Sequence, residues 1–210
     1  MGIENDINRP TPLLKPILKP ILDGLNQGGL DPNLIAWYPG TSFNDSAGSN
    51  DLTANGGMLA NVLLNSQRWF QLDGVDDYAD GLPTSVQSGE ATWSCKFNVS
   101  SATANQRLFG NSSSNTYIIW RNGATSISVR TSLNVSRTFT VPNMSVGVDY
   151  DLSVTRDASD NFRLYLDGTE SSTGAINDTG TLPLDRLGAI STHTDTPLDR
   201  DWETDRKSVV

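Results

Sequence analysis

The sequence is poor in the residues that carry most nucleophilic and zinc chemistry: its 210 residues include one cysteine and one histidine. Cys95 stands alone, so no intramolecular disulfide can form, and its alternating neighbours indicate a small buried residue. His193 lies in "STHTDTP", and the chain has no G-x-S-x-G nucleophile elbow. We therefore expect neither a nucleophilic triad nor a zinc centre.

Long basic runs and long apolar runs are missing as well. No three consecutive residues are basic, and the formal net charge is −9. Nucleic-acid binding needs clustered lysine and arginine against the phosphates, so we expect no nucleic-acid partner. No stretch is long and apolar enough for a transmembrane helix or a classical signal peptide, so we expect no membrane insertion.

The first 33 residues differ from the rest of the chain. Residues 10–34 repeat KPIL and hold five of the ten prolines. Apolar residues between Leu14 and Leu25 recur at helical spacing, but Pro16 and Pro20 each remove a helical hydrogen bond. Gly28, Gly29 and Asp31-Pro32 read as a hinge. We expect residues 1–33 to form a short helical or extended arm that attaches the protein to a larger assembly.

The remainder has the succession of strand-forming and turn-forming segments that is typical of an all-β protein. Short β-branched and aromatic runs alternate with Gly, Asn, Asp and Ser clusters about every ten residues. About ten strands in this length imply two packed antiparallel sheets. Strands are predicted at 34–38, 52–54, 69–72, 91–98, 107–110, 116–121, 126–132, 137–141, 149–156, 161–166 and 187–190.

One hairpin is especially clear. In "YDLSVTRDASDNFRLYLDG" two alternating strands flank the polar tip 157–161, which suits a type I turn with a bulge. Leu152 and Val154 should pair with Phe162, Leu164 and Leu166 on one face. By the same alternation Ile127 and Val129 should face the core, with Arg130 facing outward.

Three segments resemble the laminin G-like, concanavalin A-like jelly rolls. "FQLDGVDDYAD" is similar to that family's early F-DG-DDY segment, "DYDLSVTRDASDNFRLYLDGTESSTG" to its W-HVA-T-D-G--RLY-DG hairpin, and "LDRLGAI" to the L-IG strand that follows. Asp149-Tyr150 stands where the family usually has tryptophan. The likeness runs from about residue 34 to 190 and implies a two-sheet jelly-roll sandwich, which we place at 34–199.

The acidic stretch "WFQLDGVDDYADG" allows two interpretations. Asp73-Gly74 is a turn signal between the strand of Phe70 and Leu72 and one that begins near Tyr78, so the acids would cap and turn the chain. The resemblance also implies a calcium site, in which Asp76 or Asp77 would supply a carboxylate and backbone carbonyls would complete the oxygen ligands. The spacing does not match the twelve-residue helix-loop-helix calcium loop.

Some members of the resembled family are glycoside hydrolases, which need two carboxyl groups flanking the scissile bond. The chain has four glutamates, and the E-x-D-x-x-E pattern of laminarinase-type enzymes is absent. We therefore predict that the protein is not an enzyme, and glycoside hydrolysis ranks third among its functions.

The first-ranked function is glycan or cell-surface binding, and the second is a purely structural role. Sugars are held by aromatic faces and by polar groups that reach their hydroxyls. The predicted ligand-binding residues are Trp120, Arg121, Asn122, Arg130 and Arg137. Tyr117 and Ile119 alternate with Ile118 and Trp120, so only one pair can enter the core. Trp120 is either exposed, as its place among the ligand-binding residues requires, or packed inside the sandwich. Trp37, Trp69 and Trp93 are expected in the core.

An Asn-, Ser- and Thr-rich, Lys-poor composition is common in phage fibre and capsid-decorating proteins. We therefore expect a virion protein, assembled in the host cytoplasm and placed on the virion or another extracellular surface. The last residues break the pattern: "DRKSVV" is the translation of GATCGGAAGAGCGTCGTG, which resembles sequencing-adapter read-through. We expect residues 200–210 to be non-native or disordered, with the family's last strand missing and a sheet edge left unpaired.

Overall fold

The computed structural model describes residues 34–64, 67–73, 76–84, 88–99, 105–120 and 125–188, with the backbone of residues 207–209. The chain divides after Ile35 into two units, and the fold below is that of the second, Ala36–Val210. Its described residues form strands and no α-helix, which confirms the predicted all-β class. None of them lies in a helix able to cross a membrane. The predicted arm at 1–33 lies outside the described residues.

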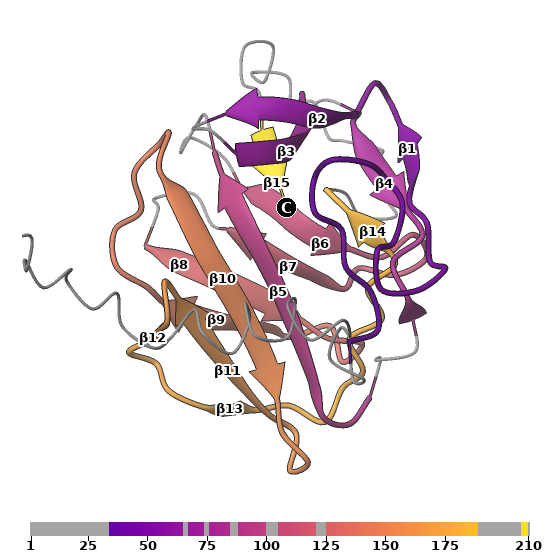
Figure 1. Ribbon diagram of the computed structural model, residues 1–210. Coiled ribbons are helices and arrows are strands. Elements are labelled where there is room, and N and C mark those ends of the chain that lie inside the picture. The colour runs from indigo at the N-terminus through magenta and orange to yellow at the C-terminus, as the bar shows by residue number, and fades with distance from the viewer. Residues whose placement is uncertain are drawn as a thin grey trace, which may run out of the picture. The chain divides into compact units, whose positions relative to one another are not determined.

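Two antiparallel sheets make up this unit, with β5 and β10 lying in front of β6 to β9 (Figure 1). The seven-stranded sheet has the order β1 (Thr53–Asn55), β4 (Tyr78–Asp80), β14 (Arg186–Leu187), β6 (Gln106–Gly110), β7 (Tyr117–Trp120), β8 (Ser126–Arg130), β9 (Ser136–Thr140). The eight-stranded sheet has the order β12 (Thr169–Glu170), β11 (Asn161–Leu166), β10 (Asp149–Arg156), β5 (Ala91–Asn98), β15 (Lys207–Val209), β3 (Gln67–Leu72), β2 (Leu59–Leu64). Strand β13 (Ile176–Asn177) pairs with β11 outside this order.

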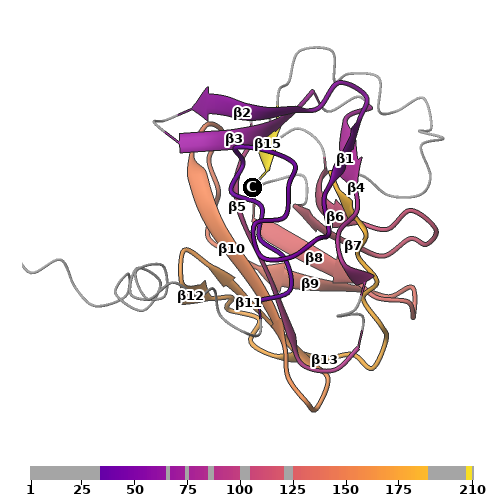
Figure 2. The ribbon, with the colours of Figure 1, turned by 45° about the vertical axis from the view of Figure 1, so that its right-hand side comes forward.

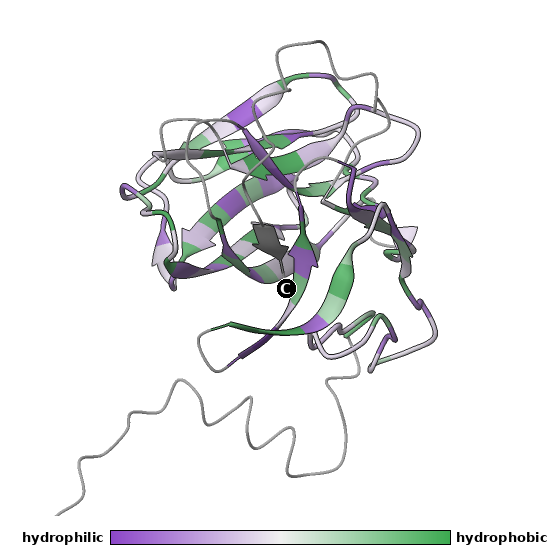
Figure 3. Cartoon of the chain, turned by 90° about the horizontal axis from the view of Figure 1, so that it is seen from above, coloured by the Kyte–Doolittle hydropathy of each residue, from purple (hydrophilic) through white to green (hydrophobic). Residues whose placement is uncertain are grey.

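The core lies between the two sheets, which the turned view separates (Figure 2). Phe97 on β5 and Trp120 on β7 are completely buried, and their ring centroids lie 6.4 Å apart across the two layers. Hydrophobic and hydrophilic residues alternate along many of the strands (Figure 3). Burying each large apolar side chain contributes about 1.5–3 kcal/mol, so this shared face accounts for much of the stability. The architecture confirms the predicted jelly-roll sandwich.

The predicted hairpin is confirmed in its register. Leu152 lies opposite Leu166 and Val154 opposite Leu164, and all four are buried. At the tip Asp160 has a φ of 61°, and the Asp157 N–H donates to the carbonyl of Asn161 over 3.1 Å. Strand β10 also pairs with β5 along its full length.

The predicted strand at 34–38 is wrong, because the backbone groups of Trp37 form hydrogen bonds within a loop instead of pairing with a strand. The Trp37 N–H donates to Asp45 Oδ1 over 2.9 Å, and the Trp37 carbonyl accepts from the Ser46 N–H over 2.8 Å. Burial alone would raise the pKa of Asp45, but hydrogen bonds from Trp37, Ala47 and Asn50 hold it below its usual value. The expectation of a core Trp37 is also wrong, since its side chain is 48% exposed. Trp69 and Trp93 are buried, as expected.

The prediction that the missing last strand leaves a sheet edge unpaired is wrong, because three residues of the tail form a strand there. Lys207–Val209 forms β15 between β3 and β5, pairing with both. The backbone groups of two neighbouring strands are best satisfied by a strand between them, which explains why this slot is filled. Residues 200–206 and 210 lie outside the described residues, so the non-native origin of the tail and the boundary at 199 stay predictions.

Candidate functional site

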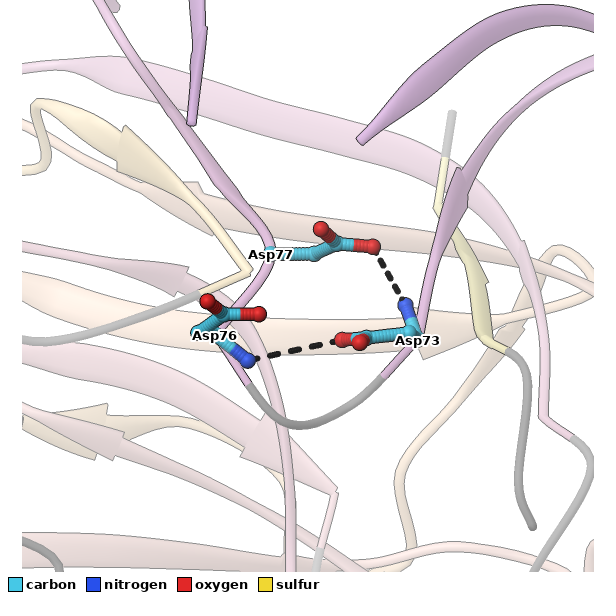
Figure 4. Close-up of side chains that lie close together, drawn as sticks. All are labelled: Asp73, Asp76 and Asp77. Atoms are coloured by element: carbon cyan, nitrogen blue, oxygen red, sulfur yellow. Dashed lines mark hydrogen bonds between the residues drawn. The ribbon is translucent and has the colours of Figure 1, made fainter. Parts of the chain in front are cut away.

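Three aspartates gather where the chain passes from β3 in one sheet to β4 in the other (Figure 4). One carboxylate oxygen from each of Asp73, Asp76 and Asp77 lies within 4.8 Å of the others. The Asp73 N–H donates to Asp77 Oδ2 over 2.6 Å, and the Asp76 N–H donates to Asp73 Oδ1 over 3.4 Å. These bonds support the interpretation of the acids as turn-forming residues.

The electrostatics of this acidic turn, Asp73 to Asp77, are unfavourable when all three carboxylates are charged. Asp77 is 8% exposed. Burial raises the pKa of Asp77, and the negative charges of Asp73 and Asp76 raise it further, against the hydrogen bond from the Asp73 N–H. A cation among these oxygens would relieve the repulsion, and an all-oxygen set is the kind that calcium prefers. Calcium at Asp76 and Asp77, now joined by Asp73, remains a prediction.

A glycine turn holds the acidic turn in place. Gly56 and Gly57 connect β1 to β2, so this turn also passes from one sheet to the other. Gly56 has a φ of 78°, and a Cβ there would lie 2.5 Å from the Asp76 carbonyl oxygen and 2.8 Å from the Asp77 nitrogen. Because these contacts are to backbone atoms, the two turns touch too closely for any side chain at Gly56.

Gly56→Ala is expected to destabilise the protein more than Gly89→Ala. Gly89 has a φ of 81°, and nothing lies within 4 Å of the position that a Cβ would take. Gly89→Ala should therefore cost only the backbone strain of an alanine at positive φ, about 1–2 kcal/mol, which Gly56→Ala also incurs. The clash with the acidic turn should add about 1–3 kcal/mol to the loss at Gly56. Urea unfolding of both variants measures the difference, and equal losses would contradict the close contact.

Among the predicted ligand-binding residues, Trp120 is wrongly assigned, because it is not exposed. Its side chain is 0% exposed and faces the core with Ile118. Tyr117 and Ile119 take the outward face instead, where they form a separate small cluster. The four-residue strand is buried on both faces, so its hydrophobicity did not indicate which face turns inward.

Arg130 lies on the outward face as predicted. Its guanidinium carbon is 5.9 Å from the centroid of the Tyr117 ring, and its Nη2 donates to Asn134 Oδ1 over 3.4 Å. The Tyr117 hydroxyl is 3.0 Å from the hydroxyl of Ser136, the residue opposite Arg130 on β9. Arg121 and Asn122, which follow β7, lie outside the described residues.

Arg137 lies on the opposite face of the sheet from Arg130. It stands opposite Val129, a core residue, and its Nε donates to Asp178 Oδ2 over 2.7 Å. The Asp178 side chain is 0% exposed and also accepts from Thr131 Oγ1 and the Gly180 N–H. Burial alone would raise the pKa of Asp178, but the Arg137 side chain and these other donors hold it below its usual value. The structure therefore gives Arg137 a structural partner and does not bring it together with Arg130.

Asp178→Asn is expected to cost about 2–3 kcal/mol of stability, because it removes the charge that Arg137 pairs with. The folded pKa of Asp178 lies below its usual value of 3.8. The stabilisation is therefore complete well above that value and is lost as the pH falls through the folded pKa. Urea unfolding between about pH 7 and about pH 2 should show the difference between wild type and variant shrinking with acid.

Glu170→Gln serves as the control, because Glu170 pairs with Arg163 at an exposed position. It should cost about 1 kcal/mol or less. A loss at Asp178 no larger than at Glu170, or one that does not depend on pH, would contradict the buried ion pair.

Arg107 on β6 was not predicted as a ligand residue. It lies opposite Ile119, so it faces outward on the same side as Arg130. The pairing shifts between Arg107 and Phe109, and this irregularity inserts Leu108 into the core. Regular alternation read from the sequence cannot indicate such a bulge.

Comparisons with known proteins agree with this fold. Residues 73–199, more than half of the chain, match a family described as the concanavalin A-like lectin/glucanases superfamily. No curated protein sequence matches significantly.

Among solved structures, the ligand-binding domain of botulinum neurotoxin serotype D in complex with N-acetylneuraminic acid is similar over 79% of this chain and 42% of that one, with 13% identity and a TM-score of 0.58. The receptor-binding domain of the botulinum neurotoxin C/D mosaic serotype is similar over 79% and 43%, with 12% identity and a TM-score of 0.57. The binding domain of paraclostridial mosquitocidal protein 1 is similar over 79% and 44%, with 12% identity and a TM-score of 0.52. The chain thus spans less than half of each of these chains, and the likeness is one of fold.

Proposed function

Because the chain belongs to the concanavalin A-like lectin/glucanases superfamily, we propose that it is a non-catalytic module that binds glycans or cell surfaces within a larger assembly. The observation that carries the proposal is the outward face of β6 to β9. This binding face, as we call it, presents the partly exposed Arg107, Arg130 and Ser136 and the exposed Thr138, which lie around the buried Tyr117. Guanidinium and hydroxyl groups on a rigid sheet are suited to sugar hydroxyls.

Two further observations support glycan binding without hydrolysis. One solved structure with this fold is described as a ligand-binding domain in complex with N-acetylneuraminic acid. Of the glutamates, Glu170 is paired with Arg163 on the other sheet, and the acidic turn uses its carboxylates to hold its own backbone. A glycosidase would instead need two carboxyl groups free to flank a sugar bond.

The proposed setting is a virion, as a fibre or a capsid decoration, or another extracellular surface. The partners are a glycan or host surface on one side and other virion proteins, through the arm at 1–33, on the other. The composition of the sequence supports this setting. The alternative is a purely structural sandwich without a ligand.

A glycan array tests the proposal against the structural alternative. The folded protein should retain at least one sugar, and free sugar should displace it, whereas the urea-unfolded chain should retain none. Incubation with the retained glycan should release no shorter product. A folded protein that holds no sugar at high concentration would favour the structural role, and product release would favour a glycosidase.

Calcium at the acidic turn is the proposed cofactor, with Asp73, Asp76 and Asp77 as its carboxylate ligands. At 100 times its dissociation constant, calcium should add about 2.7 kcal/mol of stability. Asp77→Asn and Asp76→Asn should abolish the shift in melting temperature between calcium and chelator. Asp151→Asn, an exposed acid on the other face of the sandwich, should keep it. Identical melting of the wild type with calcium and with chelator would contradict the proposal.

A further inference from the structure

The binding face has the opposite charge from the protein as a whole. The strand residues that face outward from β6 to β9 include two arginines, Arg107 and Arg130, and no acid, and the neighbouring strands β14 and β4 add one arginine, Arg186, and one acid, Asp80. The formal net charge of the chain is −9. A cationic area on an acidic protein is therefore a local feature that the overall composition does not explain.

Within the part of the chain that the structure describes, Arg186 is the one of these three arginines that is paired with a carboxylate. Arg186 Nε lies 2.5 Å from Asp80 Oδ1, and its guanidinium carbon lies 4.4 Å from the centroid of the Tyr78 ring. Among the described residues, Arg107 and Arg130 form no ion pair, and the Nε atom of each is buried without a hydrogen-bond partner. A buried donor left unsatisfied costs about 1–3 kcal/mol, so an acceptor placed near either guanidinium would be favourable.

The two unpaired arginines flank the same strand. Arg107 stands opposite Ile119, and Arg130 stands opposite Tyr117, which lies two residues before Ile119 on β7. With ordinary strand spacing their backbones are about 12 Å apart, which two extended arginine side chains can bridge toward one ligand. The Tyr117 ring and its hydroxyl contact with Ser136 position the Arg130 guanidinium.

We infer that this face binds an acidic glycan, a sugar whose carboxylate is held by Arg107 and Arg130. The inference rests on the proposed function and adds the chemical class of its ligand. The planar guanidinium fork matches a carboxylate in two hydrogen bonds, which a neutral hydroxyl does not. Two isolated arginines suit a single carboxylate, whereas a polyphosphate would need a basic cluster and would be repelled by the acidic remainder.

The test uses matched sugars that differ in one carboxylate. Isothermal titration should give at least tenfold tighter binding for sialyllactose than for lactose, or for a glucuronic-acid-terminated oligosaccharide than for its glucose-terminated counterpart. A sulfated counterpart distinguishes a carboxylate from another oxyanion: equally tight sulfate binding would overturn the carboxylate assignment.

Variants locate the site. Arg107→Gln and Arg130→Gln should each weaken binding of the acidic sugar at least tenfold, a clearly larger factor than that by which they weaken binding of the neutral sugar. Arg163→Gln, on the eight-stranded sheet and likewise partly exposed, should change binding less than twofold. Arg107→Lys and Arg130→Lys keep the positive charge but lose the planar guanidinium group, so their affinities for the acidic sugar should lie between those of the wild type and the glutamine variants. They replace a glutamine variant in the test if that variant does not fold.

The outcomes separate the inference from the proposed function. Equal binding of acidic and neutral sugars overturns the acidic class while leaving a glycan-binding module. Preference for the acidic sugar that survives both arginine substitutions overturns the location. No binding of any glycan overturns both.

Discussion

Both sheets must turn an apolar face toward one shared core, and the positions of the outward groups follow from that constraint. Phe97 and Trp120 meet across the layers with ring centroids 6.4 Å apart, and both are completely buried. Because side chains alternate along a strand, placing Trp120 inward places Tyr117 and Ile119 outward on β7. The residues on the binding face are therefore determined by the packing on the other side of the same strands. The backbone that carries its arginines is held in place by that core packing.

The same constraint explains the acidic turn. Strands β3 and β4 belong to different sheets, as do β1 and β2, so both connections must cross the edge of the sandwich. They cross side by side, with Gly56 against the backbone of Asp76 and Asp77. A crossing leaves N–H groups without strand partners, and short acidic side chains satisfy them locally. The carboxylates are thus gathered by the topology, and the close approach of the second turn contributes to the burial that raises the pKa of Asp77.

Much of this fold could be predicted because local patterns and long-range packing agree. The β10–β11 register follows from alternating leucines and a polar tip, and the structure has it at Leu152 and Leu166. Other features depend on information that alternation does not carry. "YIIW" is apolar on both faces, so Trp120 could not be oriented, and the irregular pairing next to Arg107 hides the direction of its side chain. The Trp37 N–H donates a hydrogen bond to the Asp45 side chain eight residues away, and the residue pattern of a strand cannot reveal such a bond.

One position of register decides the chemistry of two arginines on neighbouring strands. Arg130 lies opposite Ser136, and Arg137, the next residue along β9, lies opposite Val129. That single step turns Arg137 toward the core, where the completely buried Asp178 accepts a hydrogen bond from its Nε. It leaves Arg130 outward beside Tyr117, with no carboxylate partner among the described residues. The Asp178 carboxylate has no exposed surface, whereas the Arg137 side chain keeps 31% of its own, so the buried charge is the one that the protein itself must neutralise. Arg130 on the outer face has no ion-pair partner among the described residues, and this difference from Arg137 is why the proposed carboxylate ligand is placed at Arg130.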